Sequence, residues 1–267
     1  MLYALRSEVI RLRGELQYYS FNYLAGVALN LILFAGIYFA VTKASDTSQV
    51  NVFNLLVAYL VWYYASDILN QMSLTVIEEA LLGTLEQVYI SRTPIHLVLL
   101  TRALSSLLRT SLFIVVFLII VVPAFDLLEY TAGLGVGDWI ALVGICAVAL
   151  IGATGLGLTL FGLSILFKRV GAVKVILDFV LLMFSGVFVS VKELPLALEG
   201  AASILPFTWA LESLRLLVSH GVPASELVSR GEWLAALAVA AAYLFAGTLI
   251  ARWCLDAGRR RGALAHY

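Results

Sequence analysis

Six long apolar blocks constrain this chain more than any other feature of its sequence. A helix that crosses the hydrocarbon core of a membrane needs about 20 predominantly apolar residues. Blocks of that kind lie at residues 23–42, 52–71, 104–124, 139–167, 175–191 and 233–252. They predict an all-α, polytopic membrane protein with six transmembrane helices. The whole chain, 1–267, then forms one domain: a helix at 1–20, a six-span bundle over 23–252 and a basic tail at 253–267.

The composition excludes the soluble classes of protein. Of the residues, 62% are hydrophobic and 13% are charged, whereas soluble domains average about 25% charged residues. Too little polar side chain is present to cover a water-soluble enzyme of this length. Seventeen basic residues balance seventeen acidic ones, so no electrostatic footprint for nucleic acid is present and no nucleic-acid partner is expected.

The distribution of basic residues predicts the orientation. If both termini are inside, thirteen of the seventeen Lys and Arg side chains fall in inner segments, and only Lys43, Lys192, Arg215 and Arg230 fall outside. Basic residues concentrate on the cytoplasmic side of membrane proteins. We therefore predict a multi-pass protein of the cell (inner) membrane with both termini in the cytoplasm.

The first twenty residues predict an amphipathic helix. One apolar stripe recurs at spacings of three and four residues and consists of Leu2, Leu5, Val9, Leu12 and Leu16. Such a helix lies in the membrane interface, in contact with lipid. It serves either as a simple anchor or as a contact with a partner. It lacks the small-residue cleavage site of a signal peptide.

Residues 191–232 differ from an ordinary loop. Pro195, Pro206 and Pro223 separate short apolar runs at 194–205 and 207–218, and neither run is long enough to span. They predict two short re-entrant helices between spans five and six, or a small outer cap. Broken helices at membrane depth require a covering of protein or water, so the segment is a candidate gate, or else a packed outer loop.

Glycines in the fourth block indicate close packing of helices. Gly152, Gly155, Gly157 and Gly162 lie within one apolar helix, and small residues let transmembrane helices approach each other closely. They lack the lysine of a phosphate-binding loop, and the chain contains no G-x-x-x-x-G-K-[ST] motif. We expect no nucleotide to bind this chain itself.

Ionisable side chains within the spans predict an ion pair. Asp67, Arg109 and Asp178 all fall toward the inner ends of their predicted helices. Charges within a membrane are costly and usually paired. Our hypothesis is that Arg109 pairs with Asp67 or with Asp178. The alternative is that these side chains extend to the inner surface. Near the outer end, Glu212 and Arg215 are three residues apart and can pair on one helix face.

Aromatic residues in the second block admit two interpretations. Tyr59, Trp62 and Tyr63 lie in mid-span at helical spacing. They are candidates for lining a translocation path for an amphipathic or sugar-like substrate. The commoner role of such side chains is core packing.

Cysteine and histidine provide no basis for a metal site. Cys146 and Cys254 lie in apolar runs without C-x-x-C spacing, and His96, His220 and His266 are far apart. Structural or catalytic metals need ligands that are clustered. We predict no metal and no cofactor bound by this chain, and no catalysis by this chain alone.

Two motifs carry a resemblance to a known family. The first is the segment between the second and third blocks, where Gly83, Thr84, Leu85, Glu86 and Gln87 precede Ser91 and Pro94. This pattern resembles the coupling-loop signature of the type 2 family of ABC transporter permeases. The resemblance implies that these residues contact an ATPase.

The second motif follows the fifth block and agrees in order and spacing. It comprises Phe184-Ser185-Gly186, Leu194-Pro195 and Leu205-Pro206-Phe207-Thr208, followed by Glu212 and Arg215. It is similar to the family's fifth span and outer re-entrant hairpin. The resemblance makes six residues candidates for an outer gate: Ser185, Gly186, Pro195, Pro206, Glu212 and Arg215.

The resemblance implies the permease half of an ATP-driven ABC exporter. ATP and Mg²⁺ would bind a separate ATP-binding subunit, and a second permease subunit, most simply an identical one, would complete the path. The expected substrate is amphipathic or lipid-linked, such as a glycan or a drug, moved outward by alternating access.

Two other classes of membrane protein remain as alternatives. An ion-coupled secondary transporter normally places an acid or broken helices near the bilayer midplane. The third, fourth and sixth blocks contain no acid at mid-depth. An intramembrane enzyme needs its reactive groups at one depth, whereas His96 and His220 are predicted on opposite sides.

Overall fold

The computed structural model contains helices and turns in the part of the chain that it describes. The structure describes residues 14, 18, 20–44, 49–81, 95–128, 131, 134–167, 170–188, 191–193 and 195–260. Among them no residue belongs to a β-strand. The all-α prediction is therefore confirmed for these residues.

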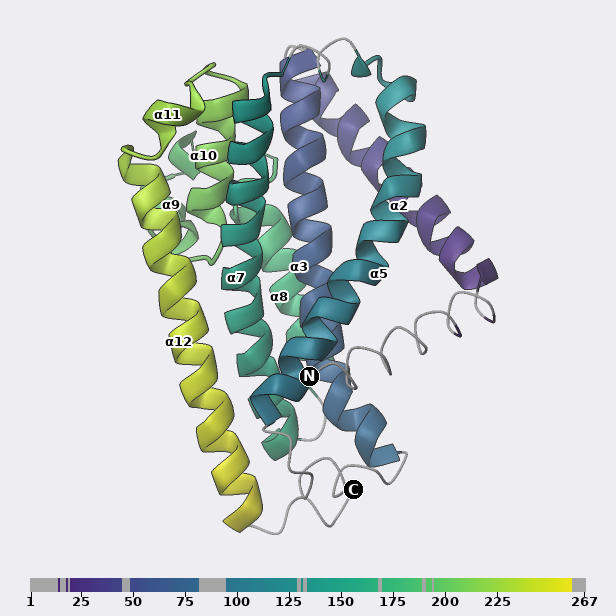
Figure 1. The fold of residues 1–267 in the computed structure, drawn as a ribbon, viewed down its shortest axis with the longest axis vertical. Coiled ribbons are helices and arrows are strands. Elements are labelled where there is room, and N and C mark those ends of the chain that lie inside the picture. Colours follow the sequence, from purple (N-terminus) through teal and green to yellow (C-terminus); the bar gives the residue numbers. More distant parts are fainter. Residues whose placement is uncertain are drawn as a thin grey trace.

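Five long helices form the bundle, and shorter ones complete it. The long helices are α2 (Ser20–Ala44), α3 (Gln49–Leu81), α5 (Ile95–Ala124), α7 (Val136–Phe167) and α12 (Gly231–Arg260). The shorter elements are α8 (Gly171–Phe184), the 3₁₀ turn η1 (Val191–Glu193), α9 (Leu196–Ala202), α10 (Thr208–Val218) and α11 (Ala224–Leu227). Figure 1 shows α12 beside α7 at one edge, with α3 in the middle and α2 and α5 beyond it.

The two ends of the bundle differ. In Figure 1 the helices α9, α10 and α11 gather in the upper part of the molecule. The C-terminal ends of α3 and α12 and the N-terminal end of α5 lie at the lower end. We call these the α10 end and the α3–α5 end. Helix α10, with two of the gate candidates, and the two helix ends that flank the predicted coupling segment thus lie at opposite ends of the bundle.

Among the described residues, five helices are long and apolar enough to cross a membrane. They cover Phe21–Val41, Val52–Leu74, Leu107–Ala124, Val136–Phe167 and Gly231–Gly258. These correspond to the first, second, third, fourth and sixth predicted spans. The chain is therefore a multi-pass membrane protein.

The block at 175–191, predicted as the fifth span, is not one continuous helix. Helix α8 begins earlier, at Gly171, and ends at Phe184. At about 1.5 Å per residue its 14 residues reach about 21 Å, short of a core about 30 Å thick. The helix stops where Gly186 takes a φ of 91°, which an L-residue with a side chain rarely adopts. Two short helices, α9 and α10, then follow as the proline spacing predicted.

Helix α3 forms the centre of the core. Of its most apolar window 67% is buried, compared with 11% for α2. It packs against α7, α5, α8 and α10. Aromatic rings pack where α3 meets α2 and α5. The ring centroid of Phe34 on α2 lies 5.3 Å from that of Tyr59 on α3 and 5.8 Å from that of Phe117 on α5. All three side chains are fully buried.

Helices α7 and α12 pack at very short range. A Cβ atom at Gly155 would overlap the backbone of Tyr243 and Leu244, and one at Gly247 would overlap the backbone of Gly155. Further along, a Cβ at Gly162 would lie 3.0 Å from the Cα of Ala251. The predicted role of these glycines in close packing is confirmed here, because only hydrogen at the α-carbon permits the approach.

Both ends of the chain extend beyond the described residues. The predicted amphipathic helix at 1–20 lies outside them, apart from Gly14, Tyr18 and Ser20. Its apolar stripe stays a prediction. At the other end, α12 continues through the predicted boundary at residue 253 as far as Arg260, so the first part of the basic tail is helical.

Candidate functional site

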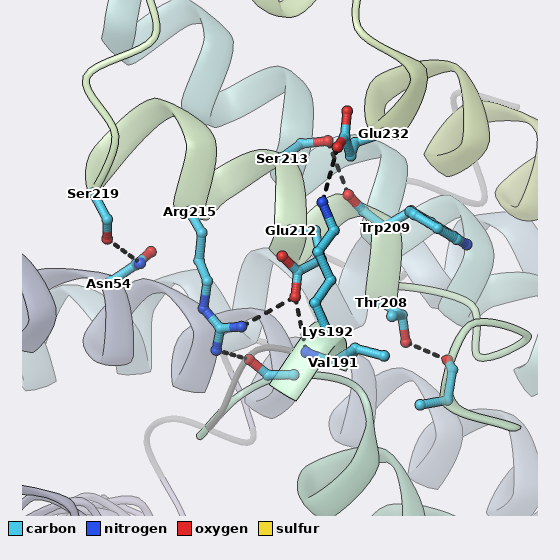
Figure 2. A network of polar contacts seen from close by, with 12 residues as sticks. Asn54, Val191, Lys192, Thr208, Trp209, Glu212, Ser213, Arg215, Ser219 and Glu232 are labelled. Atoms are coloured by element: carbon cyan, nitrogen blue, oxygen red, sulfur yellow. Dashed lines mark hydrogen bonds and ion pairs between the residues drawn. The ribbon is translucent and has the colours of Figure 1, made fainter. Parts of the chain in front are cut away.

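Helix α10 carries polar side chains on one face. Glu212 and Arg215 are three residues apart, and Ser219 follows four residues later, at the C-terminal cap of the helix. Residues at such spacings lie on the same side of a helix. Figure 2 shows these side chains directed toward the segment around Val191 and toward Asn54 of α3.

Glu212 and Arg215 form an ion pair, as the sequence predicted. The Nη1 atom of Arg215 lies 3.1 Å from Oε1 of Glu212. The same carboxylate oxygen accepts a hydrogen bond from the backbone N–H of Val191 at 2.9 Å. The Nη2 atom of Arg215 donates to the carbonyl oxygen of Gly186 at 2.5 Å. The pair thus connects α10 to two points of the segment that follows α8, at Gly186 and at Val191.

The end of α8 explains why these charges are buried. When a helix stops inside the bundle, its last carbonyls and the next N–H groups lose their helical partners. Such groups need other partners, because a buried and unpaired backbone group is unfavourable. Arg215 satisfies the carbonyl of Gly186, and Glu212 satisfies the N–H of Val191. Only 8% of the Glu212 side chain and 16% of the Arg215 side chain are exposed, so the ion pair is largely buried.

Two buried oxygens of this region have no hydrogen-bond partner. Asn54 donates through Nδ2 to Oγ of Ser219 at 2.7 Å, but its Oδ1 atom is unpaired. The Oγ atom of Ser185, which is fully buried, is likewise unpaired. Each such group costs about 1–3 kcal/mol. The α10 end therefore contains two buried polar atoms whose hydrogen-bonding capacity the protein does not use.

The turn between α9 and α10 is anchored on α7. The hydroxyl of Thr208 donates to the carbonyl of Ala202 at 2.7 Å, and Nε1 of Trp209 donates to that of Ser203 at 2.9 Å. A Cβ at Gly152 would lie 2.8 Å from the carbonyl oxygen of Pro206. Pro206 therefore packs directly on the α7 backbone.

The six gate candidates do not all meet. Arg215 contacts both Glu212 and Gly186, and Ser185 adjoins this group. Pro206 is placed by its packing on α7. Pro195 is the exposed N-cap of α9. The structure thus concentrates the predicted polar contacts in one place and gives the two prolines separate structural roles.

An exposed ion pair adds a second link to this end. The Nζ atom of Lys192 lies 3.1 Å from Oε1 of Glu232, at the start of α12. Sequence reasoning did not identify this contact or the one between Asn54 and Ser219. Asn54 could have been singled out from the sequence as an asparagine within an apolar span. Nothing in the sequence indicated the contact between Lys192 and Glu232, which are far apart along the chain.

The aromatic path candidates lie in different environments. Tyr59 is 1% exposed, and its hydroxyl donates to Oδ1 of Asn30 at 2.7 Å. Trp62 donates through Nε1 to the backbone carbonyl of Asp178 at 3.1 Å. The ring of Tyr63 stacks on Phe113 at 4.9 Å. In this arrangement all three rings connect α3 to neighbouring helices, which is the packing alternative. Their role in a path stays a prediction.

Arg109 pairs with Asp67 rather than with Asp178. Its Nη2 atom lies 3.6 Å from Oδ1 of Asp67. The other carboxylate oxygen of Asp67 accepts from the hydroxyl of Thr110 at 2.6 Å. Asp178 lies on α8 and pairs with Lys174, one turn earlier, at 2.5 Å. The predicted pairing of Arg109 is therefore confirmed with the first of its two candidate partners.

The comparison with known families decides what kind of protein this is. A family model described as ABC-2 type transporter matches residues 2–218, which is most of the chain. This chain belongs to the ABC-2 type transporter family. No curated protein matches it. The family identifies a permease component of a membrane transporter, which is generally not catalytic and associates with an ABC ATP-binding subunit.

The family match includes the segment predicted to couple to the ATPase. The candidates are Gly83, Thr84, Leu85, Glu86, Gln87 and Pro94, and all of them lie outside the described residues. What the structure does place are their flanks, the end of α3 at Leu81 and the start of α5 at Ile95. The match ends at residue 218, so α11 and α12 lie outside it.

No metal centre is evident in the described part of this ABC-2 permease. Among those residues no group of three or more His, Cys, Asp or Glu could hold an ion. Among the described residues, the ion pairs of Glu212 with Arg215, Lys192 with Glu232 and Glu226 with Arg230 lie at the α10 end.

Proposed function

We propose that this chain is the membrane-spanning subunit of an ATP-driven exporter. It moves an amphipathic or lipid-linked substrate, such as a glycan or a drug, outward across the cell (inner) membrane. Two copies line the path and two ATP-binding subunits supply the energy, with ATP and Mg²⁺ bound on those subunits. The observation that carries the proposal is the ABC-2 family match over residues 2–218, on a chain whose described residues include five helices long and apolar enough to cross a membrane.

The proposed topology places both termini in the cytoplasm. The α3–α5 end is then inner and the α10 end outer, in agreement with the distribution of Lys and Arg. Helix α8 and the segments after it make the remaining crossing, with α9 and α10 as re-entrant helices in the outer leaflet. The pairing of backbone groups at the α8 break by Glu212 and Arg215 supports this proposal, because broken helices at membrane depth require such partners.

Alternating access follows from rigid-body movement. ATP binding draws the two ATP-binding subunits together, and the segment between α3 and α5 transmits that closure to the helices. The contacts of α10 with the α8 break hold the outer end closed until the helices move.

Purification of the tagged chain from its native membrane in a mild detergent tests the proposal. Mass spectrometry should then identify an ATP-binding subunit in stoichiometric amount. A chain that purifies alone and transports without ATP would overturn the proposal in favour of an ion-coupled transporter.

Two substitutions test the coupling segment within the purified complex. Glu86→Ala and Leu85→Asp should each abolish the effect of the permease on the ATPase rate while leaving the helical content unchanged. The matched control is Glu226→Ala on α11, which removes an exposed acid at the opposite end. A normal ATPase rate in both coupling variants would contradict the assignment.

A further inference from the structure

Helices α3 and α5 are joined by a row of polar and aromatic contacts. The ring of Tyr63 stacks on Phe113, and the hydroxyl of Tyr64 lies 2.8 Å from Oγ of Ser111. One turn along α3 toward its C-terminus, Asp67 accepts from Thr110. As the residue number rises on α3 it falls on α5, which is the register of two antiparallel neighbours. We call this row the α3–α5 seam.

An ion pair lies at the end of the seam that is nearest the C-terminus of α3. Arg109 lies 3.6 Å from Oδ1 of Asp67 through Nη2. The amide of Gln71 lies against the same guanidinium, and its oxygen accepts from Nη2 and Nη1 of Arg109 when the amide is oriented with that oxygen toward them. The side chains of Arg109 and Asp67 are 17% and 22% exposed. The guanidinium therefore bridges two turns of α3 from one position on α5.

The seam is placed between the coupling segment and the core. About 15 Å of helix separates Gln71 from the end of α3, and about 21 Å separates the start of α5 from Arg109. On its other side α3 packs against α7, where a Cβ at Gly157 would lie 3.1 Å from Cγ of Met72. The main helical partners of α5 are α3 and α2. The seam is thus the main connection of α5 to the centre of the bundle.

We infer that the Asp67–Arg109 pair makes α3 and α5 move as one body when the ATPase acts on the segment between them. Separating two paired charges within a membrane is costly, because hydrocarbon offers them no other partner. Two helices joined only by apolar side chains would slide more readily, since lipid tails replace such contacts. Asp67 and Arg109 are therefore positioning residues that act through the helices. The inference rests on the proposed coupling to an ATPase.

Distance measurements on the complex with its ATP-binding subunit test this inference. Spin labels at Asn70 on α3 and at Leu249 on α12 report the movement of α3. Labels at Leu112 on α5 and at Leu249 report that of α5. Leu112 and Leu249 are each 48% exposed and lie outside the seam contacts described above. An excess of unlabelled chain ensures that few complexes contain two labelled copies, so the measured distances are those within one copy.

The expected result is a comparison of two shifts. On addition of ATP and vanadate, the α3 and α5 distances should change together in the parent protein. In the double variant Asp67→Asn with Arg109→Gln the two changes should differ, with one of them reduced or lost. Thr110→Val, which removes one hydrogen bond and keeps both charges, should leave them together and supplies a second folded variant with an altered seam.

Lys174→Gln is the matched control. It breaks an ion pair of similar burial on α8, with exposures of 16% and 13%, outside the seam. A merely structural role would make the seam variant and this control equally less stable and leave the concerted movement intact in both. Equal shifts of α3 and α5 in the double variant would overturn the inference, as would the absence of any ATP-dependent shift in the parent complex. Failure of the parent chain to purify with an ATPase would instead overturn the proposed function.

Discussion

The α7–α12 contact and the α3–α5 seam join neighbouring helices by opposite means. Between α7 and α12 glycines bring the backbones together, and no side chain separates Gly155 from Gly247. Between α3 and α5 the helices are held by hydroxyl, amide and charged groups, including Asp67 and Arg109. The first contact depends on shape and tolerates no added atom. The second depends on hydrogen bonds and an ion pair. It should tolerate a change in side-chain size better than the loss of a hydrogen-bonding or charged partner.

The difference suggests different roles. Van der Waals packing acts only at close range, so a separation of about 0.5–1 Å already loses a quarter to a half of the attraction between two closely packed backbones. A polar contact has a longer reach and a strong preference for specific partners. The α7–α12 pair therefore forms a fixed wall, and α3 with α5 is suited to transmit movement. The polar network at the α10 end belongs to the second type.

The largest effect is expected for a buried polar contact from which one partner is removed. Glu212→Ala removes the carboxylate that pairs with Arg215 and the acceptor of the Val191 N–H, and leaves the Arg215 charge with neutral acceptors such as the Gly186 carbonyl. Breaking a buried pair in this way costs about 3–5 kcal/mol. The free energy of unfolding, measured by titration with SDS in mixed micelles, should fall by that amount. Glu212→Gln keeps an accepting oxygen and should lose less; an equal loss would show that the hydrogen bond to Val191 does not matter.

A smaller loss is expected where one atom is added to the glycine contact. Gly155→Ala places a Cβ against the backbone of Tyr243 and forces α7 and α12 apart. Overpacking costs about 1–3 kcal/mol. The control is Gly36→Ala on α2, where a Cβ meets nothing within 4 Å and alanine improves helix propensity. The same SDS titration should separate the two. Equal stability of both variants would remove the distinction between the two kinds of contact.

Loss of one neutral hydrogen bond from the α3–α5 seam should cost less again. Tyr64→Phe removes the hydroxyl that lies 2.8 Å from Oγ of Ser111. Hydrogen bonds between transmembrane helices average about 0.6 kcal/mol. A double-mutant cycle with Ser111→Ala should return a coupling energy of that size. A coupling energy of zero would mean that the hydrogen bond between Tyr64 and Ser111 does not help to join the two helices.

The exposed ion pair should matter least. Lys192→Ala removes the contact with Glu232, in which the lysine side chain is 55% exposed. Exposed pairs contribute less than about 1 kcal/mol and are screened by salt. The free energy of unfolding of the variant should be slightly below that of the parent protein at low salt. At high salt the two values should be equal. A loss of unfolding free energy as large as that of Glu212→Ala would show that solvent exposure does not explain the difference in strength expected between these two ion pairs.

Much of the fold was predictable from local properties of the chain. The length and apolarity of a block decide whether a helix can span, and both are read directly from residues such as 139–167. Spacings of three and four residues decide which side chains share a helix face, so the Glu212–Arg215 pair was predictable too. The stop after Phe184 was not recognised in the block at 175–191, although Gly186 was its signal.

Contacts between helices were decided only by the tertiary structure. Sequence reasoning left Arg109 two partners, and the packing of α5 on α3 selected Asp67. It recognised the glycines of α7 but not Gly247, the residue of α12 that faces Gly155. The acceptors and donors that Glu212 and Arg215 find beyond their own helix, at Val191 and Gly186, were likewise invisible. The physical reason is that residue spacing determines which side chains share a helix face, whereas the rotation and offset of one helix against another depend on how all the side chains pack together.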